Sequence, residues 1–79
     1  MIAMNDRIRA ALGQAGLSPL PEKNDSLLAD YGVDSLLLAL LVSELEREFK
    51  FRIDPYDVEG DSFRSIDSIA EFLRGKGIQ

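Results

Sequence analysis

The sequence predicts an all-α fold, a small four-helix bundle with a long first loop and a short third helix. Two observations support this prediction. Every long periodic segment repeats its apolar residues at the spacing of an α-helix. The only stretch with a preference for β-structure, residues 49–53, is short and has no partner strand. With 46% hydrophobic and 29% charged residues, the 79-residue chain has a globular composition, and we expect residues 1–79 to form a single domain.

The first helix is expected from Met4 to Ala15, because apolar residues at positions 4, 8, 11, 12 and 15 lie on one stripe of a helix. Gly16 follows as a stop signal. Residues 17–34 contain two prolines and several Asn, Asp, Ser and Gly residues, so we expect a long structured loop there. Five apolar residues are expected to hold this loop against the core: Leu17, Leu20, Leu27, Leu28 and Tyr31.

The second helix is expected from Ser35 to Phe49, with the Asp34 carboxylate as its N-cap. At about 100° per residue, its core face carries Leu38, Leu41, Val42, Leu45 and Phe49. The opposite side carries Leu36, Ala39 and Leu40, with Leu37 at the flank. Some apolar surface therefore faces outward. It is either a docking patch for partners, or a set of ordinary exposed leucines, or a patch that the preceding loop covers.

A short third helix is expected to have Asp54 as its cap and Pro55 at its first position, and to end at Gly60. Ser65 is the expected cap of the final helix, and Arg74 lies at its end. The apolar residues of that helix repeat at i, i+3, i+4 and i+7: Ile66, Ile69, Ala70 and Leu73. Residues 75–79 are expected to form a frayed tail.

The composition excludes much catalytic chemistry. The chain has no His and no Cys, so it cannot form a Ser-His triad, a cysteine nucleophile, an iron–sulfur cluster or an ordinary structural zinc site. The acids of residues 54–61 lack the spacing of an EF-hand calcium loop, and no metal site is expected. The net charge of -5 argues against nucleic-acid binding and favours partners with basic surfaces.

Targeting signals are not recognisable in the sequence. The first residues lack the basic and apolar regions of a signal peptide. The longest apolar run, residues 36–42, is too short to span a bilayer. We therefore expect a cytoplasmic protein that does not bind membranes. We also expect it to be a monomer.

Ser35 is the most informative hydroxyl of the chain. At the first residue of a helix, its oxygen lies beside unpaired backbone N–H groups and the positive end of the helix dipole, which favours an attached or bound phosphate. The alternative is that Ser35 is a second N-cap candidate, and local physics alone favours this alternative.

Two long segments resemble the acyl/peptidyl carrier protein family. The first is Ser26-Leu27-Leu28-Ala29-Asp30-Tyr31-Gly32-Val33-Asp34-Ser35-Leu36, followed by Leu41-Val42-x-x-Leu45-Glu46-x-x-Phe49. The second comprises Ile53-Asp54-Pro55 and residues 63–73, which are similar to the short third helix and the closing fourth helix of that family. The resemblance covers nearly the whole chain. An Asp-Ser-Leu tripeptide is a weak signal alone and a strong one at this position in this helix pattern.

The resemblance implies a carrier and not an enzyme. It implies that a phosphopantetheinyl transferase joins 4'-phosphopantetheine to the Ser35 hydroxyl. The arm would bring the thiol that the chain lacks and hold acyl, aminoacyl or ketide chains as thioesters. The protein would present its load to enzymes such as a ketosynthase, an acyltransferase or an adenylation enzyme, and would shelter it between the second and third helices. No residue of this chain is expected to be catalytic.

The candidate partner-recognition residues are Asp34, Leu36, Leu37, Leu40 and Glu44. The resemblance implies this role for Asp34 and Leu36, whereas Leu37 and Leu40 belong to the outward apolar surface of the helix and Glu44 is the first acid after the serine. Carriers of fatty-acid synthesis typically have acidic residues just after the serine, whereas residues 36–42 here are all apolar. An apolar docking patch is similar to that of carriers from polyketide or related secondary-metabolite pathways. Two alternatives stay open: a peptidyl carrier of a nonribosomal peptide pathway, and a helical protein-interaction module in which Ser35 is only a cap.

Overall fold

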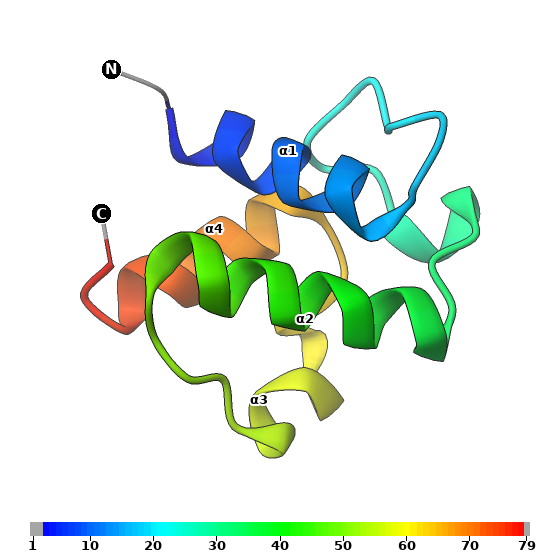
Figure 1. Cartoon of the computed structure of the whole chain (residues 1–79). Helices are drawn as coiled ribbons and strands as arrows, with labels where there is room; N and C mark the ends of the chain where they lie inside the picture. The colour runs from blue at the N-terminus through cyan, green and yellow to red at the C-terminus, as the bar shows by residue number, and fades with distance from the viewer. Residues whose placement is uncertain (1–2, 79) are drawn as a thin grey trace.

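A computed structural model describes residues 3–78, and all regular structure in that range is helical (Figure 1). The all-α prediction is confirmed. Four α-helices follow one another along the chain: α1 (Met4–Ala15), α2 (Ser35–Phe49), α3 (Pro55–Glu59) and α4 (Ile66–Gly75). Two short 3-10 helices, which the sequence analysis did not predict, lie between them: η1 (Leu28–Tyr31) and η2 (Asp61–Phe63).

The core lies between α1, α2 and α4. In Figure 1, α1 runs above α2, α3 lies below it, and α4 crosses behind. Each of the three long helices turns its predicted apolar stripe inward. The residues with no exposed surface come from all three: Ile8, Leu12, Leu41, Leu45, Ile66, Ile69 and Leu73. The third helix is peripheral, and none of its residues is buried.

The loop between α1 and α2 is held by specific hydrogen bonds. The Arg9 guanidinium donates to Asn24 Oδ1 at 2.9 Å and also to the carbonyl oxygens of Pro21 and Glu22. The Leu28 N–H donates to the Arg64 carbonyl at 2.9 Å. These bonds order the segment that leads into α2, although it has little regular structure of its own.

The apolar residues of this loop divide between the core and the surface. Leu17 and Leu28 are buried, and Leu20 and Tyr31 are half-buried, as expected. The expectation that Leu27 pins the loop to the core is wrong, because its side chain is 46% exposed. Leu28, the first residue of η1, takes the core position instead.

The expected frayed tail is wrong for residues 75–78. Gly75 is the last residue of α4, and the Ile78 N–H donates to the Leu73 carbonyl at 3.0 Å. Gly77 has φ 82°, a left-handed value that suits glycine and lets the chain turn back after the helix. Ile78 then packs against the core. Gln79 lies outside the described residues.

Candidate functional site

Ser35 is the first residue of α2, and Asp34 caps the helix. The Asp34 side chain accepts a hydrogen bond from the Leu37 N–H at 2.9 Å, and its carbonyl accepts one from the Leu38 N–H at 2.9 Å. The predicted N-cap is therefore confirmed. The alternative that Ser35 itself is the cap does not hold in this geometry, and Ser35 stays exposed.

The chain enters α2 through a sharp turn after η1. Gly32 has φ 89°, where a residue with a Cβ would be strained. The Val33 N–H then donates to the Leu28 carbonyl at 3.3 Å, and Val33 packs partly against the core. This turn fixes the position of Asp34, and the residues that begin α2, Ser35 and Leu36, are exposed.

The start of α2 suits a covalently attached anion. In a helix of fifteen residues, the first backbone N–H groups have no intrahelical acceptor and the helix dipole is positive at this end. The Asp34 carboxylate accepts the hydrogen bond of the Leu37 N–H. The N–H groups of Ser35 and Leu36, in the same turn, are therefore available to an anion. A phosphate ester on the Ser35 oxygen would lie within this field, so the residues present fit such a group.

An apolar groove opens beside Ser35, between α2 and α3. We call it the α2–α3 groove; its volume is about 450 Å³. Its walls are Ser35, Leu38, Ala39, Val42, Ile53, Pro55, Val58 and Glu59. Glu59 is the one charged residue among them. The groove therefore presents mainly hydrocarbon surface next to the hydroxyl.

A second apolar pocket lies on the other side of the start of α2. We call it the loop pocket; its volume is about 320 Å³. Its walls come from the loop, from α2 and from the region of η2: Leu27, Leu28, Ala29, Val33, Leu38, Phe63 and Arg64. The exposed side chain of Leu27 thus borders this pocket.

The predicted partner-recognition residues are only partly brought together. Leu36 is 71% exposed and Leu40 is 46% exposed. Because they are four residues apart, they lie on one face of α2, beside Ser35. We call Leu36 and Leu40 the outer leucines. Leu37 differs from them: it is half-buried and packs against the core.

Glu44 lies away from the helix start. Nine residues after Ser35, it is about 14 Å further along the helix axis at 1.5 Å per residue. Its carboxylate forms an ion pair of 3.6 Å with Arg47. The structure therefore brings Asp34 and the outer leucines together around Ser35, and places Glu44 at a distance from them.

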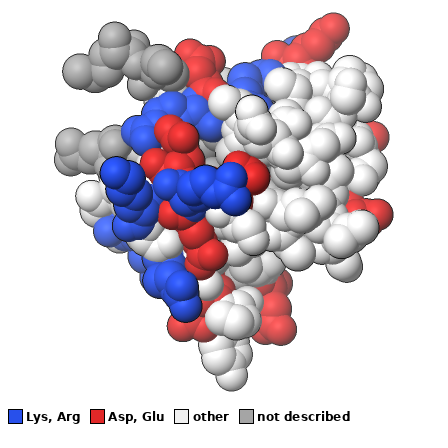
Figure 2. Space-filling view, in the orientation of Figure 1, with Lys and Arg blue, Asp and Glu red and all other residues white. Residues whose placement is uncertain are grey.

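Charged and uncharged surfaces are separated in the view of Figure 2. Lys, Arg, Asp and Glu side chains gather on the left, toward the end of α2. The surface on the right, over the loop and the beginning of α2, is mainly uncharged. The surface visible over the beginning of α2, the helix that starts at Ser35, is thus suited to contacts that depend little on charge.

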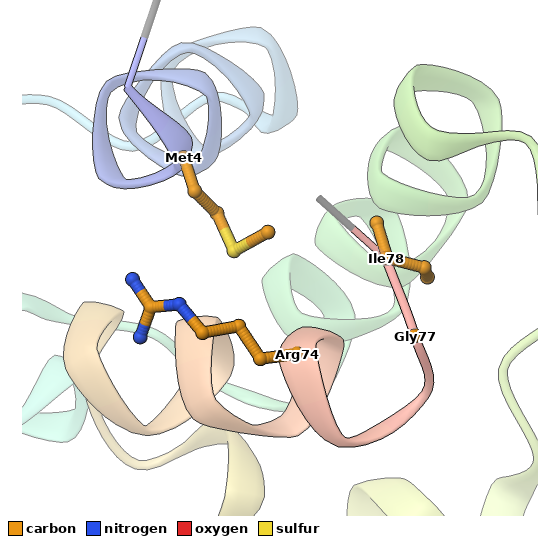
Figure 3. A pocket seen from close by; sticks show the side chains of 4 residues that line it. All are labelled: Met4, Arg74, Gly77 and Ile78. Atoms are coloured by element: carbon orange, nitrogen blue, oxygen red, sulfur yellow. The ribbon is translucent and has the colours of Figure 1, made fainter.

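A further pocket of about 450 Å³ lies where the beginning of α1 meets the end of α4 (Figure 3). Met4 and Arg74 reach toward each other across it, and Gly77 and Ile78 border it. None of its lining residues lines the groove or the loop pocket. It therefore has no part in the site around Ser35.

Sequence analysis missed the far walls of the groove. Pro55 and Val58 are three residues apart in α3, a spacing that places both on one side of a helical turn. That spacing could have indicated an apolar face toward α2. Ile53 carries no such signal, because it precedes the helix and its burial depends on the tertiary packing.

Comparison with known proteins identifies the family. Residues 6–73 match the family model described as a phosphopantetheine attachment site. The comparisons with curated proteins and with solved structures found no match. No helix in the described part of the chain is long and apolar enough to cross a membrane. Domains of the matched family are carriers and not catalysts, and they take covalent 4'-phosphopantetheine on a serine. Because the match spans most of the sequence, this chain belongs to the phosphopantetheine-attachment family of carrier domains.

Proposed function

We propose that Ser35 carries the 4'-phosphopantetheine arm and that the protein is an acyl carrier protein of polyketide or related secondary-metabolite biosynthesis. It holds acyl or ketide intermediates as thioesters. One observation carries this proposal: Ser35 is exposed at the first residue of α2, beside an apolar groove that it lines itself. A group attached to this hydroxyl is free to swing into solvent or to fold into the groove.

The protein chain positions the arm at the start of α2, and the arm provides the reactive thiol. When attached, the arm supplies the thiol that forms the thioester, and the chain has no cysteine of its own. Asp34 fixes the first turn of α2 through its bond to the Leu37 N–H. The backbone N–H groups at Ser35 and Leu36 would stabilise the negative charge of a phosphodiester on the Ser35 oxygen. An apolar load that folds into the α2–α3 groove would be partly removed from water.

Partner enzymes dock on the face around Ser35. A phosphopantetheinyl transferase contacts Asp34 and the outer leucines when it modifies the serine. Enzymes such as a ketosynthase or an acyltransferase then use the same face, with Leu37 at its edge and Glu44 at its far end. Exposed leucines at the centre of an interface contribute through desolvation, and a charged rim contributes mainly to the association rate.

The choice of pathway rests on the residues that follow the serine. Positions 36 to 42 are all apolar, and the surface around the start of α2 is mainly uncharged (Figure 2). This supports hydrophobic docking, as in polyketide-type carriers. If an adenylation enzyme loads the arm with an amino acid, the protein is instead a peptidyl carrier.

The experiment is enzymatic priming followed by intact-mass measurement. The protein is incubated with coenzyme A and a promiscuous phosphopantetheinyl transferase. We expect the wild type to gain one phosphopantetheine and Ser35→Ala to gain none. Ser43→Ala is the matched control, because Ser43 is an exposed serine of the same helix, and it should be modified like the wild type. An unmodified wild type, or a modified Ser35→Ala variant, would overturn the proposal.

A further inference from the structure

Leu38 lines both apolar pockets at the start of α2. It is the one residue shared by the walls of the α2–α3 groove and the loop pocket, among the residues described. The groove lies toward α3, and the loop pocket lies toward Leu27 and Phe63. The Leu38 side chain therefore stands between two apolar spaces that both adjoin the attachment end of α2.

The packing of Leu38 differs from that of the core leucines on the same helix. Leu41 and Leu45 have no exposed surface, whereas Leu38 is half-buried. A fully packed side chain is confined to its rotamer, but a half-buried leucine between two voids has room to change rotamer without opening the core. Leu38 is also three residues after Ser35, so both side chains lie on the same side of α2.

We infer that Leu38 is a specificity-determining residue that sets the length of the apolar cargo the carrier shelters. In its observed position it separates the α2–α3 groove from the loop pocket. A short chain on the arm fits within the groove. A longer one requires Leu38 to turn aside and then extends toward Leu27, Val33 and Phe63. This inference rests on the proposed function, because the cargo must be tethered at Ser35.

The sizes of the two spaces support this role. An enclosed apolar cavity of about 150 Å³ binds one benzene molecule, and the groove is about 450 Å³. The loop pocket adds about 320 Å³, which is a substantial extension of the groove. Each methylene group that leaves water favours the sheltered form about fourfold. The fraction of sheltered protein therefore increases with acyl chain length until Leu38 blocks further entry. Carbons added beyond that length stay in water and do not stabilise the sheltered form.

The test loads the arm with saturated acyl chains of four, eight, twelve and sixteen carbons. A promiscuous transferase transfers the acyl-pantetheine from the matching acyl-coenzyme A. The proteins are the wild type, Leu38→Ala and Leu38→Phe, with Leu20→Ala as the control, because Leu20 is also a half-buried leucine and lines neither pocket. Intact mass confirms loading of every sample. Failure to load at Ser35 would contradict the proposed function, whereas the inference is decided by the spectra of the loaded proteins.

The readouts are backbone amide chemical shifts and the rate of thioester hydrolysis. In the wild type, we expect shifts at Val42 and Val58 that grow with chain length and then level off, with little change at Leu27 and Phe63. In Leu38→Ala, the chemical-shift changes at Val42 and Val58 should level off at a longer acyl chain. Changes should then also occur at Leu27 and Phe63. In Leu38→Phe, the chemical-shift changes should level off at a shorter acyl chain than in the wild type. Hydrolysis should slow about fourfold per methylene up to the same limit.

Several results would overturn the inference. One is that long chains shift Leu27 and Phe63 in the wild type as strongly as in Leu38→Ala. Another is that both Leu38 variants level off at the wild-type length. If Leu38→Ala does not fold, the wild type and Leu38→Phe still test the inference. It is contradicted if the chemical-shift changes of Leu38→Phe level off at the same chain length as those of the wild type.

Discussion

The contrast between Leu45 and Leu40 tests whether α2 has one core face and one docking face. Both residues lie on this helix, but Leu45 has no exposed surface and Leu40 is 46% exposed. Truncation of Leu45 to alanine removes buried methyl groups and leaves a cavity, so Leu45→Ala should lower the free energy of unfolding by about 2–5 kcal/mol. Leu40→Ala loses roughly half the transfer free energy and opens no cavity, so it should cost about 1 kcal/mol or less.

The loss of unfolding free energy expected for Leu45→Ala is large relative to the total stability of the domain, so it is easy to measure. A domain of this length is stable by about 4–12 kcal/mol at the usual value per residue, so Leu45→Ala removes a large share or unfolds the protein. The assay is urea unfolding followed by the helical circular dichroism signal, since the chain has no tryptophan to report by fluorescence. With a slope of about 1 kcal/mol per molar urea, the midpoint should fall by roughly 2 M or more. Equal losses in the two variants would refute the division of α2 into two faces.

Three further predictions concern α2 and its ends. Lys50 follows α2 with φ 56°, so Lys50→Gly should relieve backbone strain and raise the free energy of unfolding by about 1 kcal/mol, measured by urea unfolding. Asp34→Ala removes the cap bond to the Leu37 N–H and should cost about 1 kcal/mol, whereas Asp34→Asn should retain most of the stability; the same unfolding assay compares them. Leu36→Asp should leave stability within about 0.5 kcal/mol of the wild type and slow priming by the transferase, measured as the rate of mass gain.

Each of these predictions has a contradicting outcome. A destabilised Lys50→Gly variant would mean that the lysine side chain contributes more than its backbone strain costs. Equal destabilisation by Asp34→Ala and Asp34→Asn would show that the cap geometry is not what Asp34 contributes. Wild-type priming of Leu36→Asp would remove the outer leucines from the docking face.

The long helices were predictable because their signals are local. The bounds of α2 follow from a capping aspartate, an apolar stripe and a terminal phenylalanine that are all contiguous in the sequence. The start of α3 follows from Asp54 and Pro55 in the same way, and the Asp54 N–H bonds to the Asp57 carboxylate at 3.1 Å within one turn. Neither inference required knowledge of distant residues.

The remaining features depend on long-range contacts that a sequence pattern does not carry. The first 3-10 helix is joined to the rest by the Leu28 N–H bond to Arg64, a residue far along the chain. The order of the C-terminal segment depends on Ile78 turning back onto Leu73. Ser35 could be identified from its motif, but the shared position of Leu38 between two pockets appears only when the loop, α2 and η2 are folded together.

The attachment of 4'-phosphopantetheine to Ser35 is tested most simply by the mass of the protein purified from its own host, followed by peptide mapping. We expect an excess mass equal to 4'-phosphopantetheine, with or without a thioester load, confined to the peptide that contains Ser35. A chain that the host leaves unmodified while its phosphopantetheinyl transferase is active, or an arm attached to any other residue, would show that Ser35 is not the attachment site.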